Sequence, residues 1–391
     1  MKAGWQVKPL GELCDILDNL RKPITKSLRT QGIYPYYGAT GILDYVEDFL
    51  FDEPLVLVGE DGAKWASGEN TAFPVKEKCW VNNHAHVLRP HRNKVIDKWL
   101  INYLVHSDLS PFVSGLTVPK LNQGNLREIP VPIPSVHEQE RIVAILDQAF
   151  KGIAKARVNA EQNLQNARAL FESHLQSVFT QRGEGWVKKK LGETSILKII
   201  DGDRGVNYPS KEEFSDDGFC LFLNTKNVRP DGFNFDITMF ISEEKDKVLR
   251  NGKLQRQDVI LTTRGTIGNV AVFDENVEFE NIRINSGMLI FRPSKDKLLS
   301  SFLFEVFRSG IMKDQMIRHV SGAAQPQLPI KTLTNFEIPV PDTLESQREI
   351  VASVRVVDAE TRRLEALYQR KIALLDELKK SLLQQAFAGE L

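Results

Sequence analysis

The hydrophobic and polar positions divide the chain into two kinds of segment, which alternate twice. Residues 14–116 and 195–322 are rich in glycine, aromatic and β-branched residues, and their short apolar runs are bounded by turn residues. We expect strands at 54–59, 86–90, 258–263, 270–273 and 287–293, and short helices at 97–107 and 298–316. These segments therefore predict two compact, β-rich α/β domains, which we name head 1 and head 2 in chain order.

A longer apolar pattern follows each head. Residues 137–181 and 344–388 contain no proline, and their apolar residues recur at intervals of three and four. The spacing predicts two α-helices of about 40 residues, each about 60 Å long. Alternating steps of three and four are typical of a coiled-coil seam. The seam residues that we expect are Ile142, Leu146, Ala149, Ile153, Ala156, Ala160, Ala167 and Leu170 in the first helix, and Ile350, Val354, Val357, Leu364, Tyr368, Leu375, Leu378 and Leu382 in the second.

Pairing of the two long helices competes with a simpler arrangement, in which each helix packs on its own head. Length favours pairing, because a rod of about 60 Å overhangs a domain of about 120 residues, whose diameter is about 35 Å. An antiparallel pair would place the heads at opposite ends of a body with near two-fold symmetry. Asn163 lies on the first apolar stripe, and both a buried role in setting the register and a solvated position at the edge remain open.

An internal repeat runs through the whole chain. Residues 5–12 recur as 186–193, with the tryptophan, one lysine and a Leu-Gly-Glu triplet in register. The offset is 181 residues there and 207 to 209 residues further on, so the ends of the two copies match and their middles differ. The later motifs are Pro-x-Leu, Ile-Pro-Val-Pro and a Gln-x-x-Ile helix start, at 119–121, 129–132 and 139–142 and again at 326–328, 338–341 and 347–350.

The repeat also predicts how the end of the second helix packs. The first copy continues from Phe179 into the motif that starts at Trp186, whereas the second copy reaches Phe387 and stops at Leu391. We expect the Trp5 segment to follow the second helix in space, as in a circular arrangement.

Composition narrows the functional class. The 391 residues suffice for more than one domain, and 51 basic residues balance 51 acidic ones, so nucleic-acid binding must rest on local patches. Cys14, Cys79 and Cys220 are too far apart in sequence to indicate a disulfide framework or a zinc ribbon. The sequence shows no secretory leader pattern and no run of 18 apolar residues, so we expect a soluble, cytoplasmic protein without a membrane partner.

Motifs for catalysis are weak or missing. His84 and His86 alternate as on one strand face, but the sequence places no third ligand for a metal site. Asp231 followed by Glu243 and Lys245 resembles only loosely the nuclease pattern of two carboxylates and a lysine around magnesium. A glycine-rich phosphate loop and an Asn/Asp-Pro-Pro-Tyr motif are both absent. We therefore expect neither a metal site, nor a bound cofactor, nor a catalytic residue in this chain.

Reading of a DNA sequence needs side chains that donate and accept hydrogen bonds at base edges, and others that contact phosphate. Polar residues on loops are the candidates, although hydrogen bonds within turns explain any single one equally well. The lysines at 188–190 are open to two interpretations, a phosphate contact or a solvated strand face. The candidates are Tyr36, Tyr37, Thr40, Glu60, Asp61, Lys64, Trp65, Asn82, Asn83 and His84 in head 1, and Asn224, Lys226, Asn227, Arg229, Thr263, Arg264, Thr266, Arg283, Asn285 and Ser286 in head 2.

The duplicated order of a variable domain, Pro-x-Leu, Ile-Pro-Val-Pro, a Gln-x-x-Ile helix start and a long helix resembles the specificity subunit of type I restriction–modification enzymes. The resemblance covers essentially the whole chain. It implies two target recognition domains, each reading one half of a bipartite, asymmetric site in double-stranded DNA, with the paired helices fixing the gap. It also implies that two modification subunits, which bind S-adenosylmethionine, dock on the helices, and that restriction subunits, which bind ATP and magnesium, join them.

We therefore predict a non-catalytic, DNA-binding specificity subunit. Its target recognition domains are expected at 1–136 and 182–343, and its long spacer helices at 137–181 and 344–391. One alternative is a self-sufficient nuclease or methyltransferase, which would cut or methylate DNA by itself. The other is a structural coiled-coil adaptor, which salt-dependent DNA binding would exclude.

Overall fold

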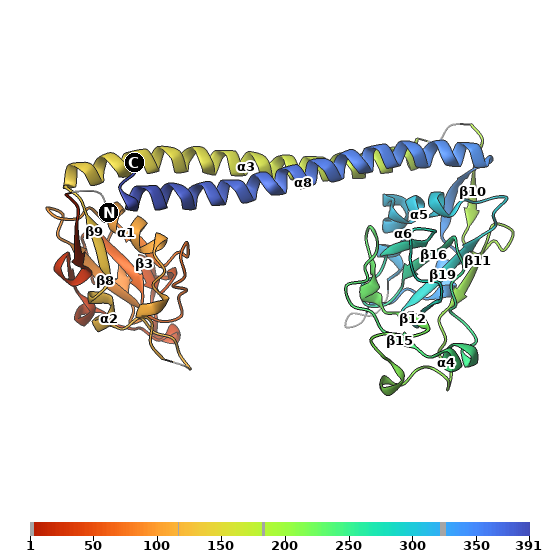
Figure 1. Cartoon of the computed structure of the whole chain (residues 1–391), viewed down its shortest axis with the longest axis horizontal. Helices are drawn as coiled ribbons and strands as arrows, with labels where there is room; N and C mark the ends of the chain where they lie inside the picture. Colours follow the sequence, from red (N-terminus) through yellow and green to blue (C-terminus); the bar gives the residue numbers. More distant parts are fainter. Residues whose placement is uncertain (1–3, 116, 182–183, 321–325) are drawn as a thin grey trace. The chain divides into compact units, whose positions relative to one another are not determined.

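The computed structural model describes residues 4–115, 117–181, 184–320 and 326–391 (Figure 1). Unit 1 consists of Met1–Gln162 and Tyr368–Leu391, and unit 2 of Asn163–Leu367. Each unit holds one head and a part of each long helix. The domain boundary predicted at residue 182 lies outside the described residues.

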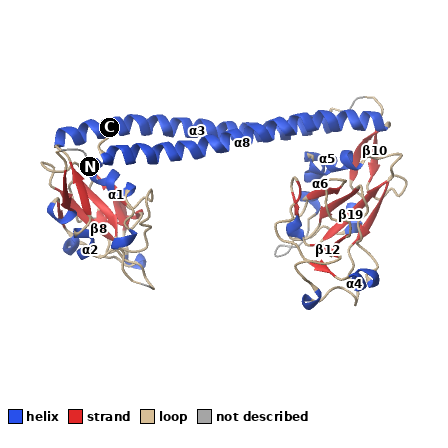
Figure 2. Cartoon of the chain, in the orientation of Figure 1, coloured by secondary structure: helices blue, strands red, loops and turns tan. Residues whose placement is uncertain are grey.

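Head 1 is built on a four-stranded antiparallel sheet (Figure 2). Its strands lie in the order β2 (Cys14–Ile16), β8 (Ala85–Pro90), β5 (Leu55–Gly59) and β6 (Ala72–Val75). Every residue of β5 is buried, as expected of a strand covered on both faces. A second sheet has the order β4 (Gly41–Val46), β3 (Gln31–Gly38) and β7 (Trp80–Val81), with β3 parallel to β7.

Head 2 has the same two sheets, although its middle sequence does not match that of head 1. The four-stranded sheet has the order β11 (Leu197–Asp201), β19 (Met288–Pro293), β16 (Asp258–Thr262) and β17 (Val270–Phe273). The three-stranded sheet has the order β15 (Phe240–Ile241), β12 (Cys220–Leu223) and β18 (Ile282–Ile284), with β12 parallel to β18. A hairpin of β13 (Val228–Arg229) and β14 (Gly232–Phe233) is added.

The matching ends of the repeat pair with one another in space. β1 (Gln6–Pro9) pairs with β9 (Pro130–Ile133), and β10 (Trp186–Lys190) pairs with β20 (Glu337–Pro341). The glycine of each Leu-Gly-Glu triplet lies where the two segments approach closely. A Cβ on Gly192 would lie 2.9 Å from the Thr334 carbonyl oxygen. A larger residue there would therefore push the segment after β10 away from the segment before β20.

The predicted strands and short helices are found. The five predicted strands correspond to β5, β8, β16, β17 and β19. The predicted helix at 97–107 is α1 (Asp97–His106), and the one at 298–316 is divided at the extended residue Ser309 into α5 (Ser300–Arg308) and α6 (Gly310–His319). The other short α-helices of the described residues are α2 (Gln123–Arg127), α4 (Glu243–Val248) and α7 (Ile330–Leu333).

The two long helices are α3 (Val136–Thr180) and α8 (Leu344–Ala388). In unit 1, Arg157 of α3 pairs with Asp376 of α8 at 2.5 Å, and in unit 2 Arg168 pairs with Glu365 at 2.7 Å. In unit 1, Lys379 of α8 also lies over the Phe150 ring of α3, so higher numbers on α3 face lower numbers on α8 and the helices run antiparallel. The predicted helix pair is confirmed, and the alternative in which each helix packs only on its own head is wrong.

Aromatic rings join the helix ends to the heads in the same way in both units. In head 2, Phe179 at the end of α3 packs on Phe302 of α5 with ring centroids 5.7 Å apart, and in head 1 Phe387 at the end of α8 packs on Trp99 of α1 with ring centroids 4.8 Å apart. Trp5 contacts the same Trp99 ring, at 5.6 Å. The Trp5 segment therefore follows α8 in space, as the repeat predicted.

The seam between the helices departs from the predicted residues at two positions. Ile142, Leu146, Ala160, Ala167 and Val354 are buried, whereas Leu170 is 61% and Leu378 is 47% exposed. Leu170 and Leu378 therefore do not belong to the seam. An α-helix drifts by about 20° per heptad against a strict repeat of 3.5 residues, so a fixed pattern of threes and fours leaves the interface near the helix ends. The partly buried residues are Ala149, Ile153, Ala156, Ile350, Val357, Leu364, Tyr368, Leu375 and Leu382, and Asn163 is exposed.

Two further observations concern the cysteines and the apolar character of the helices. Cys14, Cys79 and Cys220 are free and buried, and burial raises the pKa of each thiol to about 12. Among the described residues, no helix combines the length and the apolar character that crossing a membrane requires.

Candidate nucleic-acid interface

In head 1, the polar loops predicted to contact DNA meet at one end of the four-stranded sheet. The Leu121 N–H donates to the Glu60 carbonyl oxygen at 2.8 Å, and Asp61 forms an antiparallel bridge with Lys120. The loop before β8 joins them, because the Glu60 N–H donates to the His84 carbonyl oxygen at 2.9 Å. The segment after β5, the loop before β8 and the Pro-x-Leu segment thus form one surface.

The corresponding loops of head 2 meet through the same hydrogen bonds. The Leu328 N–H donates to the Thr263 carbonyl oxygen at 2.9 Å, and Arg264 forms an antiparallel bridge with Gln327. The Thr263 N–H donates to the Gly287 carbonyl oxygen at 2.8 Å. These matching bonds make Arg264 the equivalent of Asp61 in head 1, and Gln327 the equivalent of Lys120.

Asn82 and Asn285 are also equivalent. Each begins a turn in which its side-chain Oδ1 accepts from the N–H two residues further on, at 2.8 Å in head 1 and 2.9 Å in head 2. The backbone framework of the surface is therefore shared by the two heads, whereas the side chains that it presents differ.

The side chains of head 1 at this surface neutralise one another. Lys120 Nζ lies 2.9 Å from Glu60 Oε1 and 3.8 Å from Asp61 Oδ2, and Asp61 also contacts His84. The hydrogen bond to Glu60 raises the pKa of Lys120, so the ammonium group stays charged. Four charged or titratable groups thus hold three loops of head 1 together.

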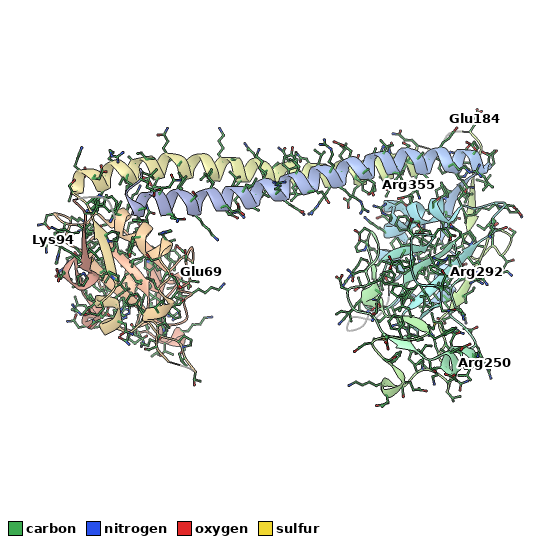
Figure 3. All side chains as sticks on the ribbon, viewed as in Figure 1. Glu69, Lys94, Glu184, Arg250, Arg292 and Arg355 are labelled. Carbon is green, nitrogen blue, oxygen red and sulfur yellow. The ribbon has the colours of Figure 1, made fainter. Side chains whose placement is uncertain are left out.

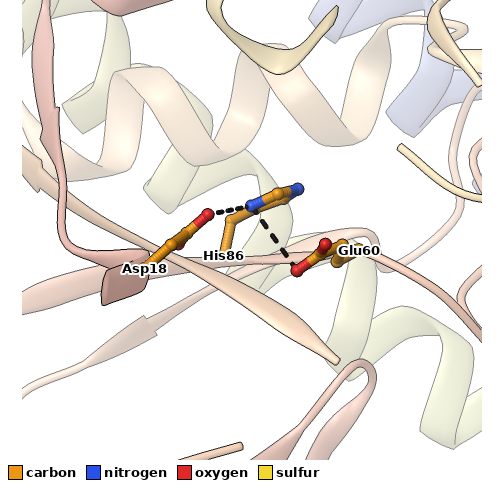
Figure 4. A group of neighbouring side chains, drawn as sticks. All are labelled: Asp18, Glu60 and His86. Carbon is orange, nitrogen blue, oxygen red and sulfur yellow. Dashed lines mark hydrogen bonds and ion pairs between the residues drawn. The ribbon is translucent and has the colours of Figure 1, made fainter. Parts of the chain in front are cut away.

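Below this surface, a buried network anchors the loops from inside head 1 (Figure 4). His86 is fully buried; its Nδ1 lies 2.6 Å from Asp18 Oδ2 and its Nε2 lies 2.7 Å from the Leu121 carbonyl oxygen. Each ring nitrogen thus faces an oxygen, and the ring links Asp18 to the Pro-x-Leu segment. Burial acts to raise the pKa of Asp18, but the hydrogen bond and the charge of His86 outweigh it and lower that pKa below its ordinary value.

The same network contains the group of side chains most similar to a metal site. One ligand atom each from Asp18, Glu60 and His86 lies within 4.8 Å of the others. Arg21 already contacts both carboxylates, at 2.5 Å from Glu60 and 3.5 Å from Asp18, and Lys120 contacts Glu60 as well. The carboxylates are therefore neutralised by protein cations, and the arrangement fits an anchor for the loops better than a metal centre.

The loose nuclease pattern of the sequence does not form a cluster. Asp231 lies 3.7 Å from Arg362, whereas Lys245 pairs with Glu213 at 2.8 Å. Glu243 instead pairs with Lys247 on the same short helix. The three residues thus have separate partners and do not converge on one point.

Head 2 carries an open hollow where head 1 has its ion pairs. The hollow has a volume of about 450 Å³ and lies between the loops that follow β12, β16 and β18. Arg264 lines it and is exposed, and among the described residues its side chain has neither an ion pair nor a hydrogen bond. The residues that line the hollow are Thr225, Arg264, Gly265, Asn285, Ser286, Gly287, Pro326 and Gln327.

Four predicted DNA contacts of head 1 are instead structural. Tyr36 is 1% exposed and its hydroxyl accepts from a backbone N–H, and Trp65 is 9% exposed and donates to the Gly59 carbonyl oxygen. Glu60 is buried by its two cationic partners, and Asn82 is buried in its turn. Their polar atoms are used inside the domain, so we remove them from the interface.

Three predicted contacts of head 2 are corrected for the same reason. Arg283 is 5% exposed and donates to Asp246 Oδ1 at 2.6 Å, which ties β18 to α4. Asn227 donates to the Ile237 carbonyl oxygen at 2.7 Å, and the Thr263 hydroxyl donates to the Gly287 carbonyl oxygen at 3.2 Å. From the sequence alone, a polar residue on a strand or in a turn that contacts DNA cannot be distinguished from one that forms hydrogen bonds within the protein.

The remaining candidates are exposed or partly exposed and stay predictions. Sequence reasoning missed Lys120 and Gln327, which lie at the centre of the two surfaces. Both are the middle residue of a Pro-x-Leu motif, which we had used only to find the repeat. The candidates that remain are Tyr37, Thr40, Asp61, Lys64, Asn83, His84, Asn224, Lys226, Arg229, Arg264, Thr266, Asn285 and Ser286.

The fold thus defines a class of duplicated proteins, in which two heads of one topology are each followed by a long helix. A family model described as the type I restriction modification DNA specificity domain matches residues 2–162 and 183–374. A putative type I restriction enzyme specificity subunit of Haemophilus influenzae is 31% identical over 310 residues, which cover 77% of this chain and 75% of that protein. The chain therefore belongs to the family of type I restriction–modification specificity subunits.

Solved structures agree on the fold. One is a chain from a study of complex assembly and conformational transition in a type I restriction–modification system, with a TM-score of 0.78 and 18% identity over 100% of this chain and 99% of that one. Another is the HsdS subunit from Thermoanaerobacter tengcongensis, with a TM-score of 0.59 and 18% identity over 100% of this chain and 98% of that one.

Proposed function

We propose that this chain reads a bipartite, asymmetric sequence in double-stranded DNA for a type I restriction–modification complex, with one half-site for each head and no catalysis of its own. The observation that carries the proposal is the pair of equivalent loop surfaces. Both heads present three loops on one backbone framework, and the side chains on that framework differ. Two similar frames with different side chains suit two half-sites of different sequence.

The chain has no net charge, so attraction to DNA must come from the loop surfaces. Lys64 in head 1, and Lys226, Arg229 and Arg264 in head 2, are exposed. Asn83 adds an exposed amide, a group that can pair with an adenine edge. The surfaces therefore combine cations for phosphate with neutral donors for bases.

Two equivalent apolar residues support docking of two modification subunits. Leu170 on α3 and Leu378 on α8 are separated by the 208 residues that relate the two helix starts, and both are exposed in their own units. An exposed leucine on a polar helix face is typical of a contact with another protein when further apolar residues lie near it. Leu374, which lies one turn before Leu378 on α8, is such a residue and is 50% exposed.

The chemistry belongs, in this proposal, to the partners. The carboxylates of the one metal-like group in the described residues already contact Arg21 and Lys120. We therefore assign S-adenosylmethionine to the modification subunits and ATP and magnesium to the restriction subunits that join them. A complex that reads and modifies cellular DNA works in the cytoplasm.

Mapping of methylated adenines in the genome of the source organism tests the proposal. We expect one motif made of two fixed half-sites and an unspecified gap, which disappears when this chain is deleted. Exchange of residues 14–116 for another head should change one half-site only. A continuous motif, or methylation or cleavage of DNA by the purified chain alone, would refute the proposal.

The docking surface has its own test. Leu170→Asp and Leu378→Asp should each remove one modification subunit from the complex, and the double variant should remove both, as measured by native mass spectrometry. The melting temperature of the free chain should stay the same, because both side chains are exposed. Full binding of two subunits by the double variant would show that docking occurs elsewhere.

A further inference from the structure

We infer that Arg264 reads a guanine in the half-site bound by head 2. The inference rests on the proposed function and goes beyond it, since it assigns one base to one side chain. Arg264 lines the hollow of head 2, and the neutral residues Thr225, Asn285 and Gln327 line the same hollow.

The guanidinium of Arg264 is available, unlike those of most arginines in head 2. Its side chain is exposed, and it has no ion pair among the described residues. No acceptor within the described residues uses its five donors, which leaves them for a ligand. The arginines of head 2 that pair with carboxylates are Arg204, Arg256, Arg283, Arg292 and Arg308.

The backbone of Arg264 is held firmly while its side chain is free. The Arg264 N–H donates to the Gly287 carbonyl oxygen at 3.2 Å, and the residue forms a bridge with Gln327. The preceding residue, Thr263, is buried and is bonded to Gly287 through both its N–H and its hydroxyl. Because the backbone of Arg264 is fixed, its guanidinium can take fewer directions. Base recognition needs such a fixed direction more than phosphate contact does.

Comparison of the heads favours a base over a phosphate as the ligand. Both half-sites carry the same phosphates, so a position that contacts phosphate would hold a cation or a neutral donor in each head. The equivalent of Arg264 in head 1 is Asp61, a carboxylate that phosphate would repel. A position that carries opposite charges in the two heads fits a contact that differs between the half-sites, and only the bases differ.

The chemistry of the side chain selects the base. A guanidinium presents two parallel N–H groups to the O6 and N7 acceptors of guanine, whereas adenine offers one acceptor and one donor on that edge. Of the described residues that line the hollow, none is acidic and could compete for the guanidinium. Asp201, which lines the neighbouring hollow, pairs with Arg204 at 3.0 Å.

Selection of randomised duplexes by the full chain, assembled with its modification subunits, tests the inference. The wild-type complex should select one G·C pair in the half-site of head 2. Arg264→Ala should lower the preference for that pair over the other pairs by about 10- to 100-fold and leave the other half-site unchanged. Arg264→Lys should lose most of the preference, because lysine lacks the two parallel N–H donors of the guanidinium. It should keep the salt dependence of binding, because the positive charge is kept.

A matched control separates the base contact from a general loss of charge. Arg250 is exposed, does not line the hollow, and lies in the part of head 2 remote from the long helices (Figure 3). Arg250→Ala removes the same charge from the same head and should leave the selected sequence unchanged.

The outcomes distinguish this inference from the proposed function. A wild-type complex that selects no sequence at all would overturn both. A selected bipartite sequence whose preferences survive Arg264→Ala, or weaken equally with Arg250→Ala, would overturn the guanine assignment alone. A change of preference at an A·T pair would show that Arg264 reads another base, and would overturn it too.

Discussion

Gln139 in α3 and Gln347 in α8 make the same three hydrogen bonds at the two places where a head joins its long helix. Both side chains are fully buried. The amide oxygen accepts from a backbone N–H at the start of a short helix, that of Ile96 at 3.0 Å or Leu299 at 2.9 Å. The amide nitrogen donates to two backbone carbonyl oxygens in each case. The Gln-x-x-Ile motif of the repeat thus fixes each helix to its head.

Gln139→Leu should lower the free energy of unfolding of the full chain by about 2–4 kcal/mol, because one backbone N–H and two carbonyl groups lose their partner in a buried place. Urea unfolding followed by circular dichroism measures this change. Gln148→Leu, at an exposed position of the same helix, is the matched control and should have little effect. Equal stability of the two variants would mean that Gln139 does not anchor α3.

Arg283 and Arg264 should respond in opposite ways to the same substitution. Arg283→Met removes one of the two cations that pair with the buried Asp246, the other being Lys253, and it leaves three backbone carbonyl groups without their donor. Head 2 should therefore lose about 3–5 kcal/mol of stability. Arg264→Met removes an exposed side chain and should leave stability unchanged. Thermal unfolding of both variants checks the contrast, and a stable Arg283→Met variant would return Arg283 to the candidates for DNA contact.

The stability of head 1 should depend on pH through Asp18. Its pKa in the folded chain is lowered, so Asp18 contributes stability above its unfolded pKa, and this contribution is lost as the pH falls through the folded pKa. Asp18→Asn should therefore be clearly less stable than the wild type at pH 7, and the difference should shrink once the pH drops below about 4. Unfolding by urea between pH 3 and pH 7 measures it; a difference that stays constant over this range would contradict the assignment.

The paired helices should set the spacing between the half-sites without affecting the base sequence of either half-site. Insertion of four residues into the middle of both α3 and α8 adds about 6 Å, on the order of one to two base-pair steps. The methylated motif should keep both half-sites and gain a longer gap. A variant that methylates different half-sites would show that reading and spacing are not separate.

The sequence predicted the architecture because two of its signals are long. Helices of 45 residues and a repeat of ordered motifs can be recognised in the sequence even where single residues depart from the pattern. The common topology of the heads was not predicted, because strands such as β7 and β18 have only two and three residues and carry too little pattern to align. The prediction of seam residues was wrong at Leu170 and Leu378 for a geometric reason, the drift of an α-helix against a fixed repeat of 3.5 residues.

The candidate site was predicted less well than the fold. The loops were found, since turn residues and polar residues mark them in the sequence. Within the loops, the sequence does not distinguish Arg283, which faces Asp246, from Arg264, which faces solvent. That distinction depends on which residues of other elements lie opposite, and only the tertiary fold supplies it.

In the sequence, unit 2 lies between the two segments that form unit 1, and this order determines which unit can be completed first during synthesis. Head 2 and its helix segments form one continuous stretch, whereas the core of head 1 includes Leu383, Ala386 and Phe387. When the ribosome has just added residue 367, all of unit 2 has been synthesised, whereas the last side chains of unit 1 have not. The first head to be translated is therefore the last to be completed, and until then its Trp99 lacks the ring that covers it.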